Sequence, residues 1–324
     1  MASNRPQIGV MFRREQDPAT LADEARRAEA LGFDQMWIVE DCFYMGGISQ
    51  AAIALTATTS ITVGIGINPG VAHNPAILAM EYATLARAFP GRLIGGIGHG
   101  VAEWMEQIGV KPKSPLKSIE EITTAVMQLL RGETVTVDGE YVKLTDVVLD
   151  PPPAVVPPVL LGVRAQKSVA LAGRIADGVL LAEGSAPGYV TWARDLMNGQ
   201  RSTPAYVGVY TNCLVDDDDP AAAFDTMRRF VAGQVGNELS PATAVLDYAN
   251  ELQTLIDRGG PDALYADMPE AWVRDLAVTG SSDEGRATID RLGESGADSV
   301  ILVPIDEGRD WANWITTAAG VLNR

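Results

Sequence analysis

The chain has few of the residues that build metal sites or disulfides. Two cysteines, Cys42 and Cys213, and two histidines, His73 and His99, occur among its 324 residues. Neither cysteine belongs to a CxxC pair, and two histidines cannot supply a histidine-rich metal site. We therefore expect no metal and no disulfide, and such low cysteine usage is typical of a reducing, cytoplasmic setting.

Basic residues and long apolar runs are also scarce. Lys and Arg total 25 against 42 Asp and Glu, which gives a net charge of −17. Such a field repels a phosphate backbone, so nucleic acid is not an expected partner. No apolar run reaches the roughly 18 residues of a membrane helix, and the first segment, MASNRPQIGVMF, is too weakly apolar for a secretory signal. These absences favour a cytoplasmic protein without nucleic-acid or membrane partners.

The sequence does contain a recurring unit, in which a helix pattern ends near a glycine and an apolar strand follows. Clear copies cover residues 28–39, 172–182 and 294–304, and a looser copy covers 88–98. The glycine can take the left-handed cap that stops a helix. A strand that is apolar throughout is typical of a parallel sheet. Alternation of such strands and helices predicts βα units.

Beyond these copies, strand and helix patterns alternate along the chain. Eight strands with eight helices predict a (β/α)8 TIM barrel, although a doubly wound open sheet shows the same alternation. The strands are expected at 8–12, 35–39, 61–67, 93–97, 159–163, 178–181, 206–215 and 299–303. The helices are expected near 18–31, 48–58, 75–89, 101–108, 166–176, 187–198, 220–236 and 310–322.

Two regions interrupt the alternation. Residues 109–158 contain an extra helix near 118–131 and a hairpin that we expect to turn at Asp138-Gly139. Residues 237–280 contain extra helices before the last strand. The whole chain is a normal length for one barrel domain with two insertions.

The active site of a barrel enzyme lies at the carboxyl ends of its strands, so the residues that follow each strand are the candidates. Glu40 and Asp41 follow the second strand, where adjacent acids can act as general acid or base. One of the two can instead cap a loop or pair with an arginine, and we expect Asp41 to line the pocket. His99 and His73 can each donate a hydrogen bond to a ring or a phosphate, or can have no role.

Glycines or basic residues mark the third, fourth and fifth strands as further candidates for ligand binding. Gly64 and Gly66 alternate in the third strand, which indicates a bulge, close approach of a ligand, or tight packing against a helix. The run GGIGHG at 95–100 opens a helix whose free N–H groups can bind an anion, but it does not match the dinucleotide fingerprint. After the fifth strand, Arg164 and Lys167 meet backbone amides at another helix start. We interpret this turn as the best phosphate site, with a solvated helix start as the alternative.

Four segments, in this order and spacing, resemble the bacterial luciferase-like superfamily. They are WIVED (37–41), ITVGIGINPGVAHNPAILAMEYATL (61–85), GRLIGGIGHGVAEW (91–104) and PPVLLGVRAQKSVALAGRIADGVLLA (157–182). Within the superfamily the chain looks closest to the deazaflavin (coenzyme F420)-dependent oxidoreductases of the methylenetetrahydromethanopterin reductase type. The resemblance implies a (β/α)8 barrel with a cofactor lying across its C-terminal mouth.

The resemblance also implies which residues hold the cofactor. A bulge in the third strand, often with a non-prolyl cis peptide in relatives, would back the central ring. It falls at Gly66-Ile67, with Asn68 beside it. The implied phosphate loops and cofactor border are Gly98, His99, Gly100, Gly162, Val163, Arg164, Ala165, Gln166, Glu183, Gly184 and Ser185. Many relatives carry an acid–histidine pair after the second strand, whereas here Asp41 stands in the histidine's place and would border the cofactor.

These features predict an oxidoreductase that transfers a hydride between coenzyme F420 and a small organic substrate. Asp41, Glu40 or His99 would move the accompanying proton. One alternative is an FMN-dependent monooxygenase that uses dioxygen, and a second is a non-catalytic flavin-binding barrel. A cofactor-free aldolase or isomerase is disfavoured because no strand ends in lysine. The apolar surface of the helix at 75–89 can form either a core face or a homodimer face.

Overall fold

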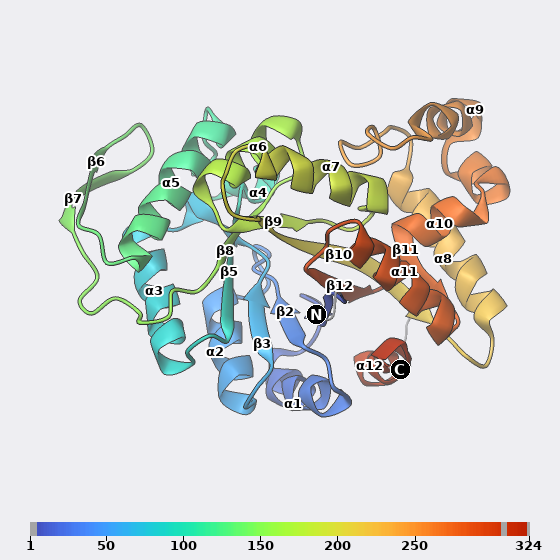
Figure 1. Cartoon of the computed structure of the whole chain (residues 1–324), viewed down its shortest axis with the longest axis horizontal. Helices are drawn as coiled ribbons and strands as arrows, with labels where there is room; N and C mark the ends of the chain where they lie inside the picture. Colours follow the sequence, from blue (N-terminus) through green and yellow to red (C-terminus); the bar gives the residue numbers. More distant parts are fainter. Residues whose placement is uncertain (1–4, 306–309, 323–324) are drawn as a thin grey trace.

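Eight parallel strands form a closed barrel in the computed structural model, which describes residues 5–305 and 310–322 (Figure 1). The strands are β1 (Gln7–Phe12), β2 (Gln35–Ile38), β3 (Thr62–Ile65), β5 (Leu93–Gly98), β8 (Val159–Gly162), β9 (Gly178–Leu181), β10 (Tyr206–Val215) and β12 (Ser299–Pro304). They pair in that order around the barrel, and β12 pairs with β1 to close it. The predicted (β/α)8 barrel is confirmed, and the open-sheet alternative is wrong.

Helices cover the outside of the barrel (Figure 1). They include α1 (Leu21–Leu31), α2 (Gly47–Ala57), α3 (Pro75–Ala88), α5 (Pro115–Leu130), α6 (Gln166–Ile175), α7 (Pro187–Asn198), α8 (Pro220–Val235), α11 (Ser282–Glu294) and α12 (Trp311–Ala318). The helix predicted at 101–108 is the short α4 (Ala102–Gln107), while α5 takes the place in the layer between α3 and α6. The helix assigned to an insertion therefore belongs to the barrel. None of the helices in the described ranges is long and apolar enough to span a bilayer.

The two insertions lie on opposite sides of the barrel (Figure 1). The first contains the predicted hairpin of β6 (Val135–Asp138) and β7 (Lys143–Val147). Its turn occupies residues 139–142 rather than Asp138-Gly139, because the Glu121 carboxylate accepts the backbone N–H groups of that turn. The second insertion contains α9 (Ala249–Asp267), α10 (Glu270–Leu276) and β11 (Ala277–Gly280). The strand β11 pairs in parallel with β10 and was not predicted.

The glycine of the recurring unit has two different roles. Gly32 and Gly296 have φ angles of 93° and 106°, the left-handed conformation expected after a helix. Gly173 differs, because it lies inside α6, where an added Cβ would come within 2.7 Å of the carbonyl oxygen of Met197. At that position the glycine lets α6 and α7 pack closely and does not end the helix.

The inside of the barrel is filled by a cluster of large side chains. Trp37 is fully buried there and meets Tyr210 edge to face, with ring centroids 5.8 Å apart. A Cβ on Gly64 would lie 2.3 Å from the Trp37 ring. Gly64 therefore makes room for a core tryptophan, and not for a ligand or a helix.

The apolar surface of α3 was predicted to form either a core face or a homodimer face. Leu78, Tyr82 and Leu85 are buried against the barrel. Ile77 and Met80 remain 49% and 48% exposed. The first three side chains form a core face, and a homodimer through the other two stays a prediction.

Glu29 ties the end of α1 to the loop before β3. Its Oε1 accepts hydrogen bonds from the backbone N–H groups of Thr59 (2.9 Å), Ser60 (2.6 Å) and Ile61 (3.0 Å). Burial acts to raise the pKa of Glu29, but these hydrogen bonds outweigh it and lower the pKa to about 2. The carboxylate thus stabilises the folded state only while it is ionised.

We expect Glu29→Gln to lower the free energy of unfolding by about 1–2 kcal/mol near pH 7. The folded pKa lies below the unfolded value of about 4.3, so the stabilisation is complete above that value and is lost as the pH falls towards 2. Urea denaturation of both proteins at several pH values would show a difference that shrinks below about pH 4.5. A difference independent of pH would contradict this role, and the exposed Glu133→Gln variant is the control.

Candidate functional site

A cavity of about 770 Å3 opens at the carboxyl ends of the barrel strands. Barrel enzymes bind their ligands at this end, and the volume lies within the roughly 300–1,000 Å3 of small-molecule pockets. Eleven of the predicted residues line it, namely Glu40, Asp41, Gly66, Ile67, His99, Gly100, Gly162, Val163, Arg164, Ala165 and Glu183. Residues that follow five different strands therefore meet at one cavity, as expected if the site lies at the carboxyl ends of the strands.

Other predicted residues lie outside the cavity wall, namely Asn68, Gly98, Gln166, Gly184 and Ser185. Ser185 is buried, and its hydroxyl donates to the carbonyl of Ala182 (2.6 Å) in the turn before α7. Gln166 is exposed at the first position of α6. The side chains of Ser185 and Gln166 thus face away from the cavity, although Ser168 of α6 lines it.

The floor of the cavity is formed at Gly66-Ile67, whose peptide bond is cis as the resemblance implies. The Tyr210 hydroxyl donates to the carbonyl of Gly66 (3.3 Å), and a Cβ on Gly66 would lie 2.0 Å from that hydroxyl. The Ile67 side chain fills the space beside Gly98 and Gly162, where an added Cβ would lie 2.1 Å and 2.7 Å from it. Gly98 therefore has a packing role in place of the predicted phosphate contact.

Glu40 is held by neighbouring groups at both of its oxygens. Oε1 contacts Nε2 of His73, while Oε2 accepts from the Asn68 side chain (2.9 Å) and from the Gly47 N–H (2.7 Å). The hydrogen bond to Glu40 raises the pKa of His73. Burial acts to raise the pKa of Glu40, but His73 and the other donors outweigh it and lower that pKa. Glu40 is therefore hydrogen-bonded at both oxygens on the cavity wall, and its predicted role as a proton carrier stays a prediction.

Asn68, which directly follows the floor residue Ile67, connects Glu40 to the helix α3. Its Oδ1 accepts a hydrogen bond from the Tyr82 hydroxyl of α3 (2.6 Å), and its amide donates to Glu40. Asn68 is fully buried. Its predicted place beside the cofactor is thus corrected to a place beneath the floor, which it fastens to β2 and α3.

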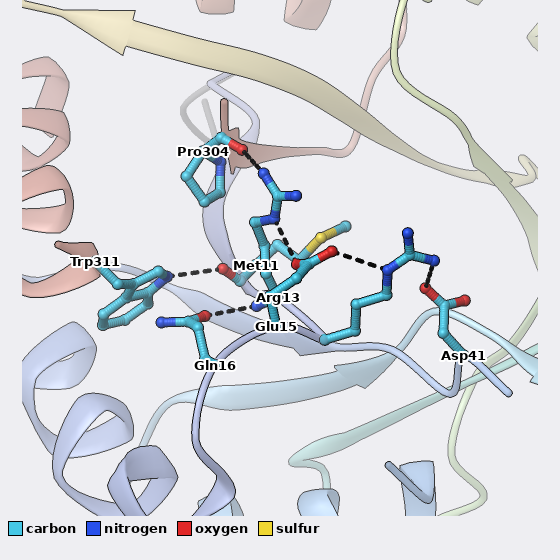
Figure 2. A network of polar contacts seen from close by, with 8 residues as sticks. Met11, Arg13, Glu15, Gln16, Asp41, Pro304 and Trp311 are labelled. Atoms are coloured by element: carbon cyan, nitrogen blue, oxygen red, sulfur yellow. Dashed lines mark hydrogen bonds and ion pairs between the residues drawn. The ribbon is translucent and has the colours of Figure 1, made fainter. Parts of the chain in front are cut away.

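Asp41 lies on the cavity wall and pairs with Arg14 from the loop after β1. The Oδ2 atom of Asp41 is 3.1 Å from a terminal nitrogen of Arg14. The Nε atom of Arg14 contacts Glu15. Glu15 in turn contacts Arg13, so charges of alternating sign run along this edge of the cavity (Figure 2). Burial raises the pKa of Asp41, and the Arg14 charge offsets only part of that shift. A carboxyl group with a raised pKa on a cavity wall is suited to proton transfer.

His99 lines the same cavity from the end of β5. Burial lowers the pKa of His99, and a hydrogen bond to the Pro115 backbone only partly opposes this. Its Nδ1 atom is buried and has no hydrogen-bond partner within the described ranges. A buried ring nitrogen needs such a partner, and a bound ligand can supply it.

The start of α6 gives the cavity a positively charged end. Ala165 is the N-cap residue of α6, and no side chain caps the helix there. Arg164 is exposed beside it and makes no ion pair with any residue that the structure describes. Lys167 is exposed outside the cavity wall. Free N–H groups and a guanidinium at one helix start can bind an anion.

Some lining residues were not predicted. Tyr210 and Asn212 face inward from β10, and alternation along that strand could have identified them. Phe230 and Gln234 come from the last turns of α8, and the Asn212 side chain donates to Oε1 of Gln234 (3.0 Å). No sequence signal identifies the α8 residues, because the way a helix end packs at the mouth depends on the tertiary structure.

Comparisons with known proteins agree with this geometry. A model of the family described as luciferase-like monooxygenase matches residues 3–299. The chain is 26% identical over 305 residues to a 5,10-methylenetetrahydromethanopterin reductase of Methanolobus tindarius, covering 91% of this chain and 93% of that protein. It is 31% identical over 191 residues to an F420-dependent glucose-6-phosphate dehydrogenase of Nakamurella multipartita, covering 54% and 55%. The structure of a coenzyme F420-dependent tetrahydromethanopterin reductase from Methanopyrus kandleri superposes with a TM-score of 0.76, at 22% identity and 97% coverage of both chains.

Proposed function

Because the chain belongs to the luciferase-like monooxygenase family, we propose that it is an oxidoreductase that transfers a hydride between coenzyme F420 and a small organic substrate. One observation carries the proposal. A single cavity joins the Gly66-Ile67 floor, the unpartnered Nδ1 of His99 and the uncapped start of α6. The F420-dependent relative and the reductase that matches most of the chain support the same chemistry.

The described residues fit a cofactor with a planar ring and an anionic tail. Ile67 and the Gly66 peptide offer a floor for the ring, and His99 offers a hydrogen-bonding nitrogen at its edge. Arg164 and the amides at the start of α6 would hold the tail. When bound, F420 supplies or accepts a hydride, and the protein has to orient the ring, exclude water and handle a proton.

Asp41 is the proposed proton carrier. Its Oδ2 accepts from Arg14, which fixes the carboxyl group on the wall and leaves Oδ1 for a substrate oxygen. His99 lines the cavity as well and can exchange a proton or a hydrogen bond there through its unpartnered Nδ1. Asn68 lies beneath the cavity wall, where its hydrogen bond to Glu40 helps to hold the floor in place.

The competing function within this family is that of an FMN-dependent monooxygenase. The same floor and the same helix start would also accept a flavin ring and a single phosphate. Arg164 would then contact the anionic group of either cofactor, so the measured affinities for F420 and FMN separate the two functions.

Titration of the purified protein with F420 and with FMN, followed by ligand fluorescence, tests the proposal. We expect micromolar binding of F420 and weaker binding of FMN. Arg164→Ala should weaken F420 binding by about tenfold and reduce its salt dependence, because one charge contact with the tail is lost. The matched control is Arg174→Ala, an exposed arginine in the last turn of the same helix.

Three other outcomes would count against the proposal. Tighter binding of FMN, with oxygen consumption when it is reduced, would favour the monooxygenase. Binding of either cofactor without turnover of any substrate would favour the non-catalytic barrel. Failure to bind both cofactors would exclude flavin and deazaflavin chemistry alike.

A further inference from the structure

The cavity has two sides that differ in chemistry. The residues assigned to the cofactor follow β3, β5, β8 and β9, whereas the opposite wall comes from β10, β12 and α8, to the right of them in Figure 1. We call this opposite wall the α8 side. It consists of Asn212, Phe230, Gln234, Val303 and Pro304, together with Pro241 from the loop after α8. If the cofactor lies over the Gly66-Ile67 floor as proposed, the α8 side is left for the substrate.

The α8 side has apolar surface and no free cation among the described residues. Phe230 remains 36% exposed at its rim, and Val303 and Pro304 extend the apolar surface towards β12. The adjoining cation is Arg13, whose Nε contacts Glu15 at 3.0 Å and whose terminal nitrogen donates to the Pro304 carbonyl at 2.9 Å. Its charge is therefore already paired. A carboxylate or phosphate on the substrate would lose its hydration here without gaining a counter-charge.

The polar groups on this side are two amides. Asn212 is 3% exposed on the inner face of β10, and its nitrogen donates to Oε1 of Gln234. This bond orients both side chains. It leaves the two N–H donors of Gln234 and the oxygen of Asn212 without protein partners in the part of the chain that the structure describes. Asn212 is buried whereas Gln234 is exposed at the mouth, and both residues line the cavity, so a ligand with a neutral polar group can bind to the two amides.

We infer that Gln234, oriented by Asn212, is a specificity-determining residue, and that the substrate presents a neutral carbonyl, hydroxyl or amide group, and not a carboxylate or phosphate, to these two amides. The inference rests on the proposed function for the position of the cofactor. Phe230 and Val303 would contact the apolar body of the substrate. A site built to hydrogen-bond a polar group discriminates strongly against analogues that lack the group or replace it by a charge.

Three probes of equal ring size test this inference, namely benzamide, benzoate and toluene. Their dissociation constants would be measured by saturation-transfer NMR, with the protein both free and saturated with F420. We expect benzamide to bind at least fivefold more tightly than toluene and about tenfold more tightly than benzoate. Gln234→Leu should remove the preference for benzamide over toluene and leave the toluene affinity unchanged.

The controls separate this inference from the proposed function. An unchanged dissociation constant for F420 shows that the Gln234→Leu protein is folded, and Gln200→Leu, in the exposed turn after α7, should leave all three probes unaffected. Benzoate binding as tightly as benzamide, a benzamide affinity that survives Gln234→Leu, or no binding of any probe would each overturn the inference. Failure of F420 to bind, with the probe preferences retained, would overturn only the proposed function.

Discussion

Replacing Asp41 by asparagine is expected to lower kcat of the F420-dependent reaction by about 10²–10⁴-fold. Asparagine keeps the size of the side chain and can still contact Arg14, but it cannot carry a proton. The dissociation constant of F420 should change little, because the tail and the floor are untouched. Steady-state rates with a substrate found by screening for F420 reduction, together with cofactor titration, measure both quantities.

The pH dependence of the same rate gives a second test of Asp41. Burial raises the pKa of Asp41, so its limb of the pH–rate profile should lie above the ordinary aspartate value of about 3.9. Arg14 lowers that pKa, so Arg14→Gln should move the limb to higher pH. Asp23→Asn is the matched control, because it removes a carboxylate that pairs with Arg26 on α1, away from the cavity. An Asp41→Asn protein with wild-type kcat would exclude Asp41 as the proton carrier.

Gly96→Ala is expected to lower the free energy of unfolding by about 3 kcal/mol or more. A Cβ on Gly96 would lie 2.1 Å from the carbonyl oxygen of Ile65 in the neighbouring strand and 3.1 Å from Cγ2 of Ile67. A backbone oxygen inside a closed barrel cannot move aside as a flexible side chain can. Urea denaturation measures the loss, and the F420 titration should show weaker binding, since Ile67 forms the cavity floor.

Another glycine provides the control for this variant. Gly233 lies in α8, where an added Cβ would meet no atom within 4 Å. Gly233→Ala should therefore raise the free energy of unfolding by up to about 1 kcal/mol, because alanine is favoured in a helix interior. Equal stability of the Gly96→Ala and wild-type proteins would show that β3 and β5 can separate, which contradicts the rigid floor.

The barrel strands could be predicted because each is apolar over its length and is bounded by turn residues. The four-residue strand β11 lacks these signals, since it directly follows α10 and gains its partner only when β10 extends beyond the barrel. The role of α5 was misassigned for a related reason. Its sequence predicts an amphipathic helix, but only the packing against α3 and α6 shows that it belongs to the barrel layer.

The candidate site divides in a similar way. Asp41 and His99 could be found because they directly follow strands, and the strand-end rule needs no knowledge of packing. The roles of Gly64 and Gly98 could not be predicted from the sequence, because each glycine makes room for a side chain that is distant along the chain, Trp37 and Ile67 respectively. Gln234 was missed because only its contact with Asn212 brings it to the cavity.

The floor of the cavity has a consequence for how the protein folds. The Tyr210 hydroxyl reaches the Gly66 carbonyl across 144 positions of the chain, and Glu40 reaches His73 across 33. Contacts between such distant positions form late, because the intervening loop entropy must be overcome first. A ligand on this floor can therefore bind only a chain whose barrel has closed, so it slows unfolding and raises stability by mass action without guiding the early steps of folding.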